Sequence, residues 1–435
     1  MMNTLPQDFL VGAATAAHQV EGNNIHSDYW AMEHMKYGNF NEPSLDAVDH
    51  YNRYEEDIKM VAEAGLNAYR FSIEWARIEP EQGVYDENEI EHYRKVLTCC
   101  RENGVEPIVT MMHFTSPKWL IENGGWENEA TVEAFKNYCQ YVTEQLGDLM
   151  HYVCTINEAN MGIQVAAISA RYRAQMMEKM QRMQQGGAEE KKDLEGTAQV
   201  GMNFNDMMAN MQKQKEENVE IFGTDTLQTF VSARTPEGDM LVIRAHQAAR
   251  AAMKAVKPEL QIGLTLSLHD IQAQEGGEET AAKEWVDEFT HYVPYIKEDD
   301  FFGLQNYSRS LIGPNGILPV PEGAEITQMD YEYYPEGLEH VIRRVYEEMP
   351  IMVTENGIAT ADDTRRVAYI QTAMNGVENC IQDGIPVKGY MYWSMMDNFE
   401  WQKGFGMTFG LISVDRTTQT RTAKPSLTVL GNYTK

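Results

Sequence analysis

The sequence predicts an α/β fold, a single (β/α)8 barrel, on the strength of three observations. Short apolar runs alternate with stretches of helical periodicity, as in repeated β-α units. Eight such runs are present, which is the number of strands in this barrel. Polar side chains gather where these runs end, and strand ends share one rim of a barrel. We expect one domain over residues 1–435, with a helical insertion at residues 171–222 after the fourth strand.

The predicted strands are short apolar segments, each followed by polar residues. An open, doubly wound sheet is the alternative, but residues 12–15 lack the spacing of a glycine-rich phosphate loop. The segment Tyr54–Ala64 is a typical predicted helix, and Gly65 ends it. In chain order the predicted strands are Phe9–Ala13, Ala68–Ile73, Pro107–Met112, Tyr152–Ile156, Gln261–Ser267, Phe301–Gln305, Ile351–Thr354 and Gly389–Trp393.

The predicted insertion is rich in methionine at helical spacing. Its methionines are Met176, Met177, Met180 and Met183, then Met207, Met208 and Met211, with Gly186-Gly187 between the two groups. One interpretation is an amphipathic surface hairpin whose methionines pack on the barrel. The other is an adaptable lid over the mouth of the site, or a subunit contact.

Composition limits the classes of partner. The 435 residues, 43% of them hydrophobic, are enough to bury a large core. Basic residues number 36 against 66 acidic ones, a net charge of −30. Such a chain repels phosphate groups, so we expect neither nucleic acid nor an anionic membrane as a partner.

Targeting and metal-binding patterns are not visible in the sequence. Residues 1–10 lack a basic region followed by a long apolar run, and no apolar stretch reaches the length of a membrane span. The five cysteines show no metal-type spacing, and no helical histidine pair has a neighbouring acid. We therefore expect a cytoplasmic protein with reduced thiols, no metal and no cofactor.

Two predicted strands, the fourth and the seventh, end in a glutamate. Glu158 follows the fourth strand and Glu355 the seventh, so the barrel brings both to one rim. A carboxylic acid and a carboxylate in such a pair cleave glycosidic bonds. Asn157 supplies an amide for a sugar hydroxyl, while Arg70 and Tyr307 are placed to support the Glu355 carboxylate.

Four motifs in order resemble glycoside hydrolase family 1, the β-glycosidase family, and the resemblance runs nearly from end to end. The motifs are residues 9–22 (FLVGAATAAHQVEG), residues 67–75 (NAYRFSIEW), residues 354–357 (TENG) and residues 392–401 (YWSMMDNFEW). This resemblance implies that Glu355 is the nucleophile and Glu158 the general acid/base, with retention of configuration. It further implies that sugar hydroxyls bind Gln19, His113, Asn157, Glu400 and Trp401, that Trp393 stacks under the ring, and that Phe409 lies near the 6-hydroxymethyl group.

The chain departs from the family pattern at several positions. Ala159 follows Glu158 where the family usually has proline, so we expect the loop after the acid to follow a different path. His18 stands where an aromatic residue often precedes the signature glutamine. Phospho-β-glycosidases of the family replace the stretch around Glu400 with a Ser- and Lys-based phosphate cradle. Because a carboxylate repels a 6-phosphate, we expect an unphosphorylated sugar.

The expected function is that of a retaining exo-β-glycosidase acting on a small-molecule or oligosaccharide β-glycoside. A β-glucoside, β-galactoside or β-fucoside all fit the predicted sugar-binding residues. Two alternatives stay open: a transglycosidase that uses the same site, and a non-catalytic sugar-binding barrel. A homo-oligomer also stays open.

Overall fold

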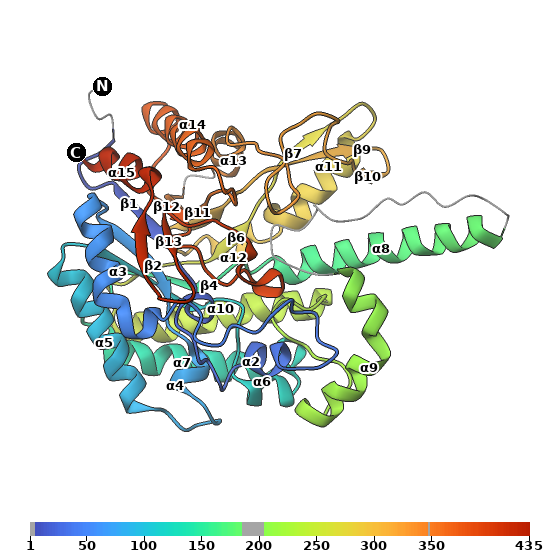
Figure 1. Cartoon of the computed structure of the whole chain (residues 1–435), viewed down its shortest axis with the longest axis horizontal. Helices are drawn as coiled ribbons and strands as arrows, with labels where there is room; N and C mark the ends of the chain where they lie inside the picture. The colour runs from blue at the N-terminus through green and yellow to red at the C-terminus, as the bar shows by residue number, and fades with distance from the viewer. Residues whose placement is uncertain (1–4, 185–203, 347–348) are drawn as a thin grey trace.

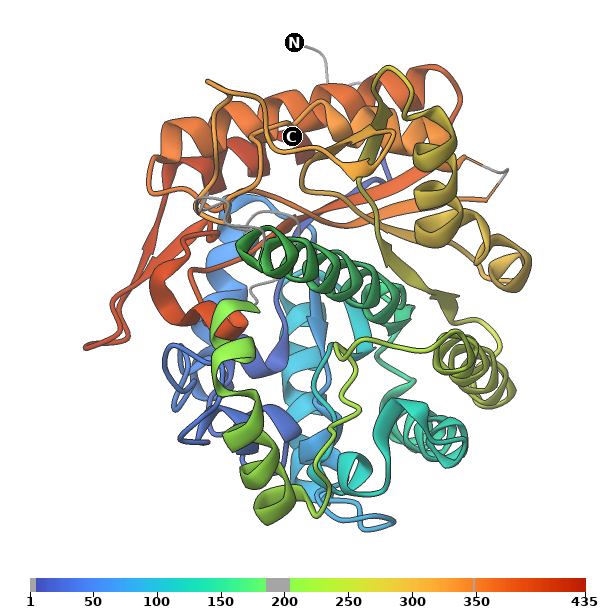
Figure 2. The ribbon, with the colours of Figure 1, turned by 90° about the vertical axis from the view of Figure 1, so that its right-hand side faces the viewer.

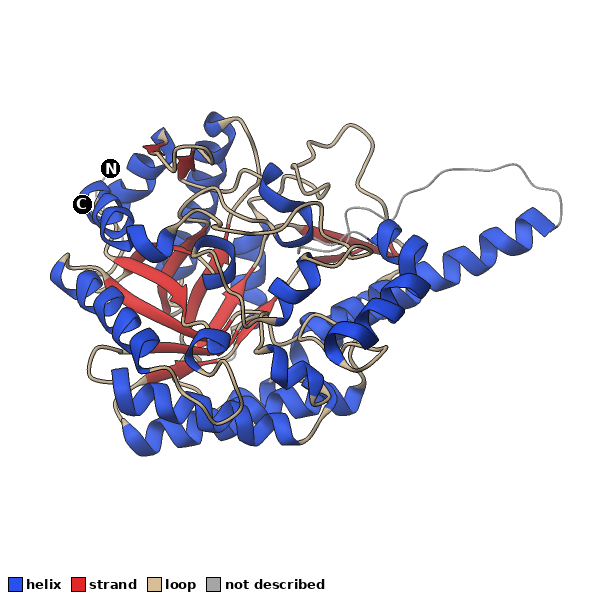
Figure 3. Cartoon of the chain, turned by 60° about the horizontal axis from the view of Figure 1, so that its bottom comes forward, coloured by secondary structure: helices blue, strands red, loops and turns tan. Residues whose placement is uncertain are grey.

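The computed structural model describes residues 5–184, 204–346 and 349–435 as a closed barrel of parallel strands wrapped by helices (Figures 1 and 3). The strand order in the main sheet is β5-β4-β3-β2-β1-β12-β11-β8-β6, and every pair of neighbours is parallel. The strands are β1 (Leu10–Ala14), β2 (Ala68–Ser72), β3 (Glu106–Met112), β4 (Tyr152–Ile156), β5 (Gln261–Gly263), β6 (Thr265–Ser267), β8 (Phe302–Gln305), β11 (Ile351–Asn356) and β12 (Val387–Trp393). The predicted (β/α)8 barrel is confirmed.

One predicted strand is divided in two. Residues 261–267 form β5, which pairs with β4, and β6, which pairs with β8. At Leu264, between them, the backbone N–H donates to Asp299 Oδ2 at 3.1 Å. A side-chain carboxylate thus satisfies an amide that a continuous ladder would use. The two halves close the ring, since each pairs with a different neighbour.

The helices cover the outside of the barrel (Figure 2). Their bounds are α1 (Ala17–Val20), α2 (Asp28–Glu33), α3 (His50–Ala64), α4 (Trp75–Ile78), α5 (Glu87–Glu102), α6 (Lys118–Glu122), α7 (Ala130–Leu146), α8 (Met161–Gln184), α9 (Phe204–Phe222), α10 (Pro236–Val256), α11 (Glu278–Trp285), α12 (Val293–Ile296), α13 (Gly337–Val345), α14 (Asp363–Gln382) and α15 (Pro425–Gly431). Helix α3 begins earlier than the sequence predicts and ends as predicted, at Gly65 with φ 101°.

Two small sheets lie outside the barrel. The first contains β7 (Asp270–Ala273), β9 (Arg309–Gly313) and β10 (Gly316–Ile317), and the second contains β13 (Ile412–Val414) and β14 (Arg421–Ala423). None of the helices in the described part of the chain is long and apolar enough to cross a membrane. All five cysteines are free thiols, and four of them are buried.

The region of the predicted insertion contains helices α8 and α9. Helix α8 starts directly after β4 and projects away from the barrel (Figures 1 and 3). Met177 is 63% exposed and Met211 is 48% exposed, so these two side chains do not pack into the barrel surface. Gly186-Gly187 and the side chains of Met176, Met180, Met183, Met207 and Met208 lie outside the described residues.

The far end of α9 returns to the barrel. The Glu217 carboxylate accepts hydrogen bonds from the backbone N–H groups of Lys36 and Tyr37, at 2.9 and 2.8 Å. Phe222 is buried in a small apolar cluster with Met35 and Ile121. These contacts attach α9 to the loop after α2 and to α6.

Candidate active site

Two buried glutamates lie at the carboxyl ends of β4 and β11. Glu158 comes two residues after β4 and is 4% exposed, while Glu355 lies within β11 and is 3% exposed. Burial raises the pKa of Glu158, and the negative charge of Glu355 raises it further. The barrel therefore brings together two carboxyl groups that are 197 positions apart in the sequence (355 minus 158).

Glu355 is held by two donors from other strands. Arg70, on β2, donates from Nη1 to Oε1 at 2.5 Å, and Tyr307, just after β8, donates from its hydroxyl to Oε2 at 2.7 Å. Burial raises the pKa of Glu355, and both donors oppose that rise because they favour the carboxylate. Arg70 and Tyr307 thus each contact one oxygen of the Glu355 carboxylate.

Asn157 has its amide orientation set by its neighbours. Its Oδ1 accepts from Arg70 Nη2 at 2.6 Å and from Gln305 Nε2 at 2.7 Å, so the two donors require the oxygen on that side. Its Nδ2 lies 3.1 Å from His113 Nε2. Since Nδ2 is a donor, Nε2 of His113 is the acceptor and Nδ1 carries the proton. Burial and the Arg70 charge lower the pKa of His113, which keeps the imidazole neutral.

The pKa of Glu158 is raised well above its usual value. Burial is the main cause, and the negative charge of Glu355 adds to it. A hydrogen bond from the Ser267 side chain and the charge of Arg70 act in the opposite direction. The two carboxyls therefore differ: the carboxylate form of Glu355 has two direct donors, whereas Glu158 is more strongly biased towards its protonated form.

Gln19 lies in the short helix α1, next to the loop after β12. Its Nε2 donates to Phe399 O at 2.7 Å, and lies 3.2 Å from Asn398 Oδ1 and 3.4 Å from Glu400 Oε2. Asn398 in turn donates to Ser394 Oγ and Met396 O, and so holds the loop after β12.

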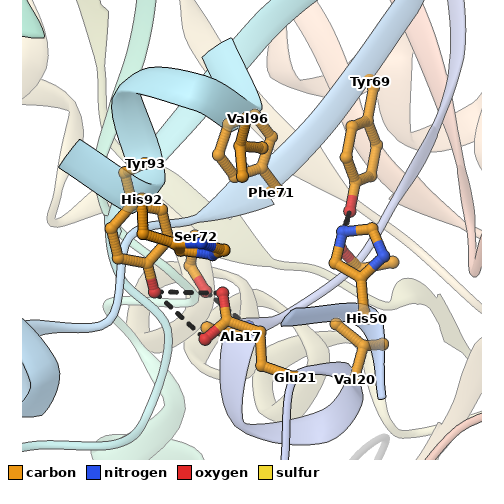
Figure 4. Close-up of a pocket in the computed structure, with 11 residues that line it drawn as sticks. Ala17, Val20, Glu21, His50, Tyr69, Phe71, Ser72, His92, Tyr93 and Val96 are labelled. Carbon is orange, nitrogen blue, oxygen red and sulfur yellow. Dashed lines mark hydrogen bonds between the residues drawn. The ribbon is translucent and has the colours of Figure 1, made fainter. Parts of the chain in front are cut away.

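Glu21 anchors the end of α1 to the helices outside the barrel. The Tyr93 hydroxyl donates to both Glu21 carboxylate oxygens, at 3.0 and 3.1 Å (Figure 4). Arg77 Nε donates to Glu21 Oε2 at 2.8 Å. The residues drawn in Figure 4 line a small cavity whose walls come from β2, α3 and α5. None of the predicted site residues lines this cavity, so we assign it a structural role in holding α1.

Aromatic rings enclose the site. The His113 ring lies near those of Trp393 and Trp401, with centroids 5.6 and 6.0 Å apart. Phe409 meets Tyr307 edge to face at 6.2 Å. All of these rings are buried. Flat apolar rings beside fixed polar groups suit a sugar, which presents CH faces between rings of hydroxyls.

Among the residues predicted to bind the sugar, two buried side-chain atoms have no hydrogen-bond partner in the described part of the chain. They are Gln19 Oε1, an acceptor, and His113 Nδ1, the protonated nitrogen of that ring. Leaving such atoms buried and unpaired costs free energy. They therefore provide one acceptor and one donor for a polar ligand.

The structure brings the predicted site residues to the carboxyl end of the barrel, and it adds others. Gln305, the last residue of β8, and Ser267, the last residue of β6, contact Asn157 and Glu158. The sequence does carry a signal for Gln305 and Ser267, because each is a polar residue at the end of an apolar run, as Asn157 is. Asn306 donates to Leu268 O and Ser308 O and has a structural role. Within the described residues, no group of three or more His, Cys, Asp or Glu side chains could hold a metal ion.

Comparison with known proteins agrees with this geometry. The model of the family "Glycosyl hydrolase family 1" matches residues 1–185 and 298–432, and leaves unmatched the segment that contains α9 and β5 to β7. The chain is 29% identical to β-glucosidase A of Acetivibrio thermocellus, over 97% of this chain and 96% of that protein. It is 27% identical to a 6-phospho-β-galactosidase of Lacticaseibacillus casei, over 98% and 97%.

A solved structure is similar over nearly the whole length. The crystal structure of the β-glycosidase BGL167 superposes with a TM-score of 0.84 at 45% identity, covering 99% of this chain and 97% of that chain. The family match covers more than half of the chain and includes both candidate glutamates. The chain therefore belongs to glycosyl hydrolase family 1 and is a glycosyl hydrolase.

Proposed function

We propose that the protein is a retaining exo-β-glycosidase in which Glu355 is the nucleophile and Glu158 the general acid/base. The observation that carries this proposal is the unequal environment of the two buried carboxyls. Arg70 and Tyr307 donate directly to Glu355, whereas burial and a neighbouring negative charge raise the pKa of Glu158. One carboxyl is thus prepared to attack and the other to donate a proton.

The first step forms a glycosyl-enzyme. Glu355 attacks the anomeric carbon while Glu158 gives its proton to the departing glycosidic oxygen, and the bond between that oxygen and the sugar breaks. Esterification removes the negative charge of Glu355, and with it one cause of the high pKa of Glu158. Glu158 then releases its proton more readily and serves as the base that activates water in the second step.

We further propose that the sugar is unphosphorylated, and most naturally a β-glucoside, β-galactoside or β-fucoside. The relatives include both a β-glucosidase and a 6-phospho-β-galactosidase, so similarity alone does not choose between them. Glu400 is buried beside Gln19. Two like unit charges 4 Å apart repel by about 4 kcal/mol at an effective dielectric constant of 20, which disfavours a phosphate here.

Aryl β-glycosides test the proposal directly. We would compare release from the glucoside, galactoside, fucoside and 6-phosphoglucoside by wild type, Glu158→Gln, Glu355→Gln and Glu79→Gln. Glu79 is a buried carboxylate that accepts from Trp75 Nε1, and so serves as a matched control. Turnover that survives in Glu79→Gln and disappears in Glu355→Gln supports the assignment. Undiminished turnover in Glu355→Gln contradicts it.

The stereochemistry is tested separately. A 2-deoxy-2-fluoro substituent slows both steps, but a 2,4-dinitrophenyl leaving group keeps the first step fast enough for a retaining enzyme to accumulate the glycosyl-enzyme. Mass spectrometry of a peptide digest should then place one sugar on Glu355. NMR of the first product should show the β-anomer, whereas an α-anomer would rule out retention.

A further inference from the structure

The strand β6 holds the segment that carries Glu158. The Thr265 hydroxyl accepts from the Glu158 backbone N–H at 2.9 Å and donates to Ile156 O, the last carbonyl of β4, at 3.2 Å. Thr265 is fully buried. Its hydroxyl therefore connects the end of the strand to the glutamate without help from solvent.

The next two residues of the segment are fixed in the same way. Ala159 donates from its backbone N–H to Thr265 O at 2.9 Å, and its own carbonyl accepts from Arg234 Nη1 at 2.9 Å. The Asn160 side chain accepts from Ser267 N at 3.0 Å and donates to Ser267 O at 2.7 Å. Each residue from 158 to 160 thus has at least one hydrogen bond to β6.

Glu158 needs such support because its backbone lies in the left-handed region, with φ 46°. A residue with a Cβ atom adopts this backbone conformation mainly where the surrounding structure holds it there. Proline has no N–H and could not make the bond that Ala159 makes to Thr265 O.

We propose that Thr265 is a positioning residue for the acid/base Glu158, because its hydroxyl and carbonyl hold the segment that carries this glutamate. This inference rests on the proposed acid/base role of Glu158. Thr265 touches no reacting atom. Its hydroxyl lies 2.9 Å from the Glu158 backbone nitrogen and, at the longer distance of 3.4 Å, also accepts from Gln305 Nε2, so its main effect is on the direction in which Glu158 is held. Its loss should therefore slow proton donation while leaving nucleophilic attack by Glu355 intact.

The dependence of kcat/KM on the leaving group distinguishes a positioning role of Thr265 from a purely structural one. A 2,4-dinitrophenyl leaving group departs without protonation, whereas a methyl or simple phenyl leaving group needs the acid. General acid catalysis is worth roughly 10²–10⁴-fold. We expect Thr265→Val to lower kcat/KM for the phenyl glycoside by roughly tenfold or more, and to change the dinitrophenyl value by less than about threefold. Thr265→Ser, which keeps the hydroxyl, should restore the phenyl value.

The controls separate this inference from the proposed function. Thr143→Val removes a buried hydroxyl that donates to Cys139 O within α7, far in sequence from the site, and should leave both values unchanged. Glu158→Gln should show the same dependence on leaving group as Thr265→Val, only larger. If Glu158→Gln lowers both substrates equally, the acid/base assignment itself fails.

The result for Thr265→Val decides whether Thr265 positions Glu158. If Glu158→Gln behaves as expected but Thr265→Val lowers both substrates equally, or neither, Thr265 has no positioning role and the inference is overturned. Should Thr265→Val fail to fold, Thr265→Ala removes the same hydroxyl without adding a methyl group in its place. The same ratio of phenyl to dinitrophenyl kcat/KM then applies to that variant.

Discussion

Tyr307 donates a hydrogen bond of 2.7 Å to Glu355, on the carboxylate oxygen opposite to the one that Arg70 binds. Each oxygen of the carboxylate thus has its own donor. Because these donors stabilise the ionised form, they determine how far the pKa of Glu355 can rise on burial.

Tyr307→Phe should move the acidic limb of the pH profile of kcat/KM to higher pH. The hydroxyl lowers the pKa of Glu355, so its removal raises that pKa, and the nucleophile ionises only at higher pH. The profile of wild type and variant on one aryl glycoside measures this. Tyr138→Phe is a suitable control, because its buried hydroxyl donates to two backbone carbonyls, Ile73 O and Met111 O, and not to Glu355. An acidic limb that stays in place would contradict the role given to Tyr307.

Glu158→Gln should remove the basic limb of the same profile. In wild type, kcat/KM falls at high pH as Glu158 loses the proton that it must donate, and its raised pKa extends activity towards neutral and alkaline pH. Glutamine does not titrate. With a dinitrophenyl glycoside, for which the acid is unnecessary, the variant should keep only the acidic limb. A basic limb that persists would assign it to another group.

Arg70→Lys should reduce turnover by on the order of 100-fold. Lysine keeps the positive charge but lacks the planar guanidinium group that donates to two partners at once. Arg70 uses Nη1 for Glu355 and Nη2 for Asn157. Arg421→Lys weakens another buried pair, with Asp57 at 2.8 Å, and is the matched control. Both variants should lower Tm, but only Arg70→Lys should lose activity. Equal activity losses would mean that stability alone explains the effect.

Glu400→Gln should shift preference towards phosphorylated sugars. The substitution removes the negative charge but keeps a hydrogen-bonding group of similar size. We expect the ratio of kcat/KM for the 6-phosphoglucoside to that for the glucoside to rise by about tenfold, which corresponds to about 1.4 kcal/mol. The ratio is measured with the two aryl glycosides at constant ionic strength. If it does not change, charge at Glu400 is not what excludes the phosphate.

Asp28→Asn should make stability less dependent on pH. Burial raises the pKa of Asp28 to about 7, from 3.8 in its unperturbed state. Between these values the folded chain keeps a proton that the unfolded chain has lost, so wild type loses stability as pH rises through this window. An asparagine side chain at this position does not titrate, so it does not contribute to the change of stability with pH. Tm at pH 5 and pH 8 should differ less in Asp28→Asn than in wild type, and Asp148→Asn, at an exposed position, should behave as wild type.

The barrel could be predicted from the sequence because its strands are buried on both faces. Runs such as Tyr152–Ile156 are apolar without alternation, which distinguishes them from the helices between them. The division at Leu264 could not be predicted, because it depends on the Asp299 carboxylate, which is distant in sequence. Strands β5 and β6 nevertheless both lie within the predicted strand Gln261–Ser267.

The site was predictable where a motif or a strand end marked a residue, as for Glu158 and Glu355. It was not predictable where a residue acts through another one. Gln305 and Thr265 are ordinary polar residues in short strands, and their importance comes from the atoms that they reach on Asn157 and Glu158. Side-chain direction at a strand end is a property of three-dimensional packing, which a one-dimensional pattern does not contain.

Arg70 also has a consequence for the order in which the barrel assembles. The buried guanidinium lies on β2, yet its counter-charge lies on β11, more than 280 residues later. A nascent chain that has not yet produced β11 would have to bury this cation unpaired, which is costly. Burial of Arg70 in a partial barrel made from the first strands is therefore unfavourable in free energy until Glu355 has been synthesised. The ion pair that stabilises the Glu355 carboxylate thus also disfavours a barrel that closes before β11 has been made.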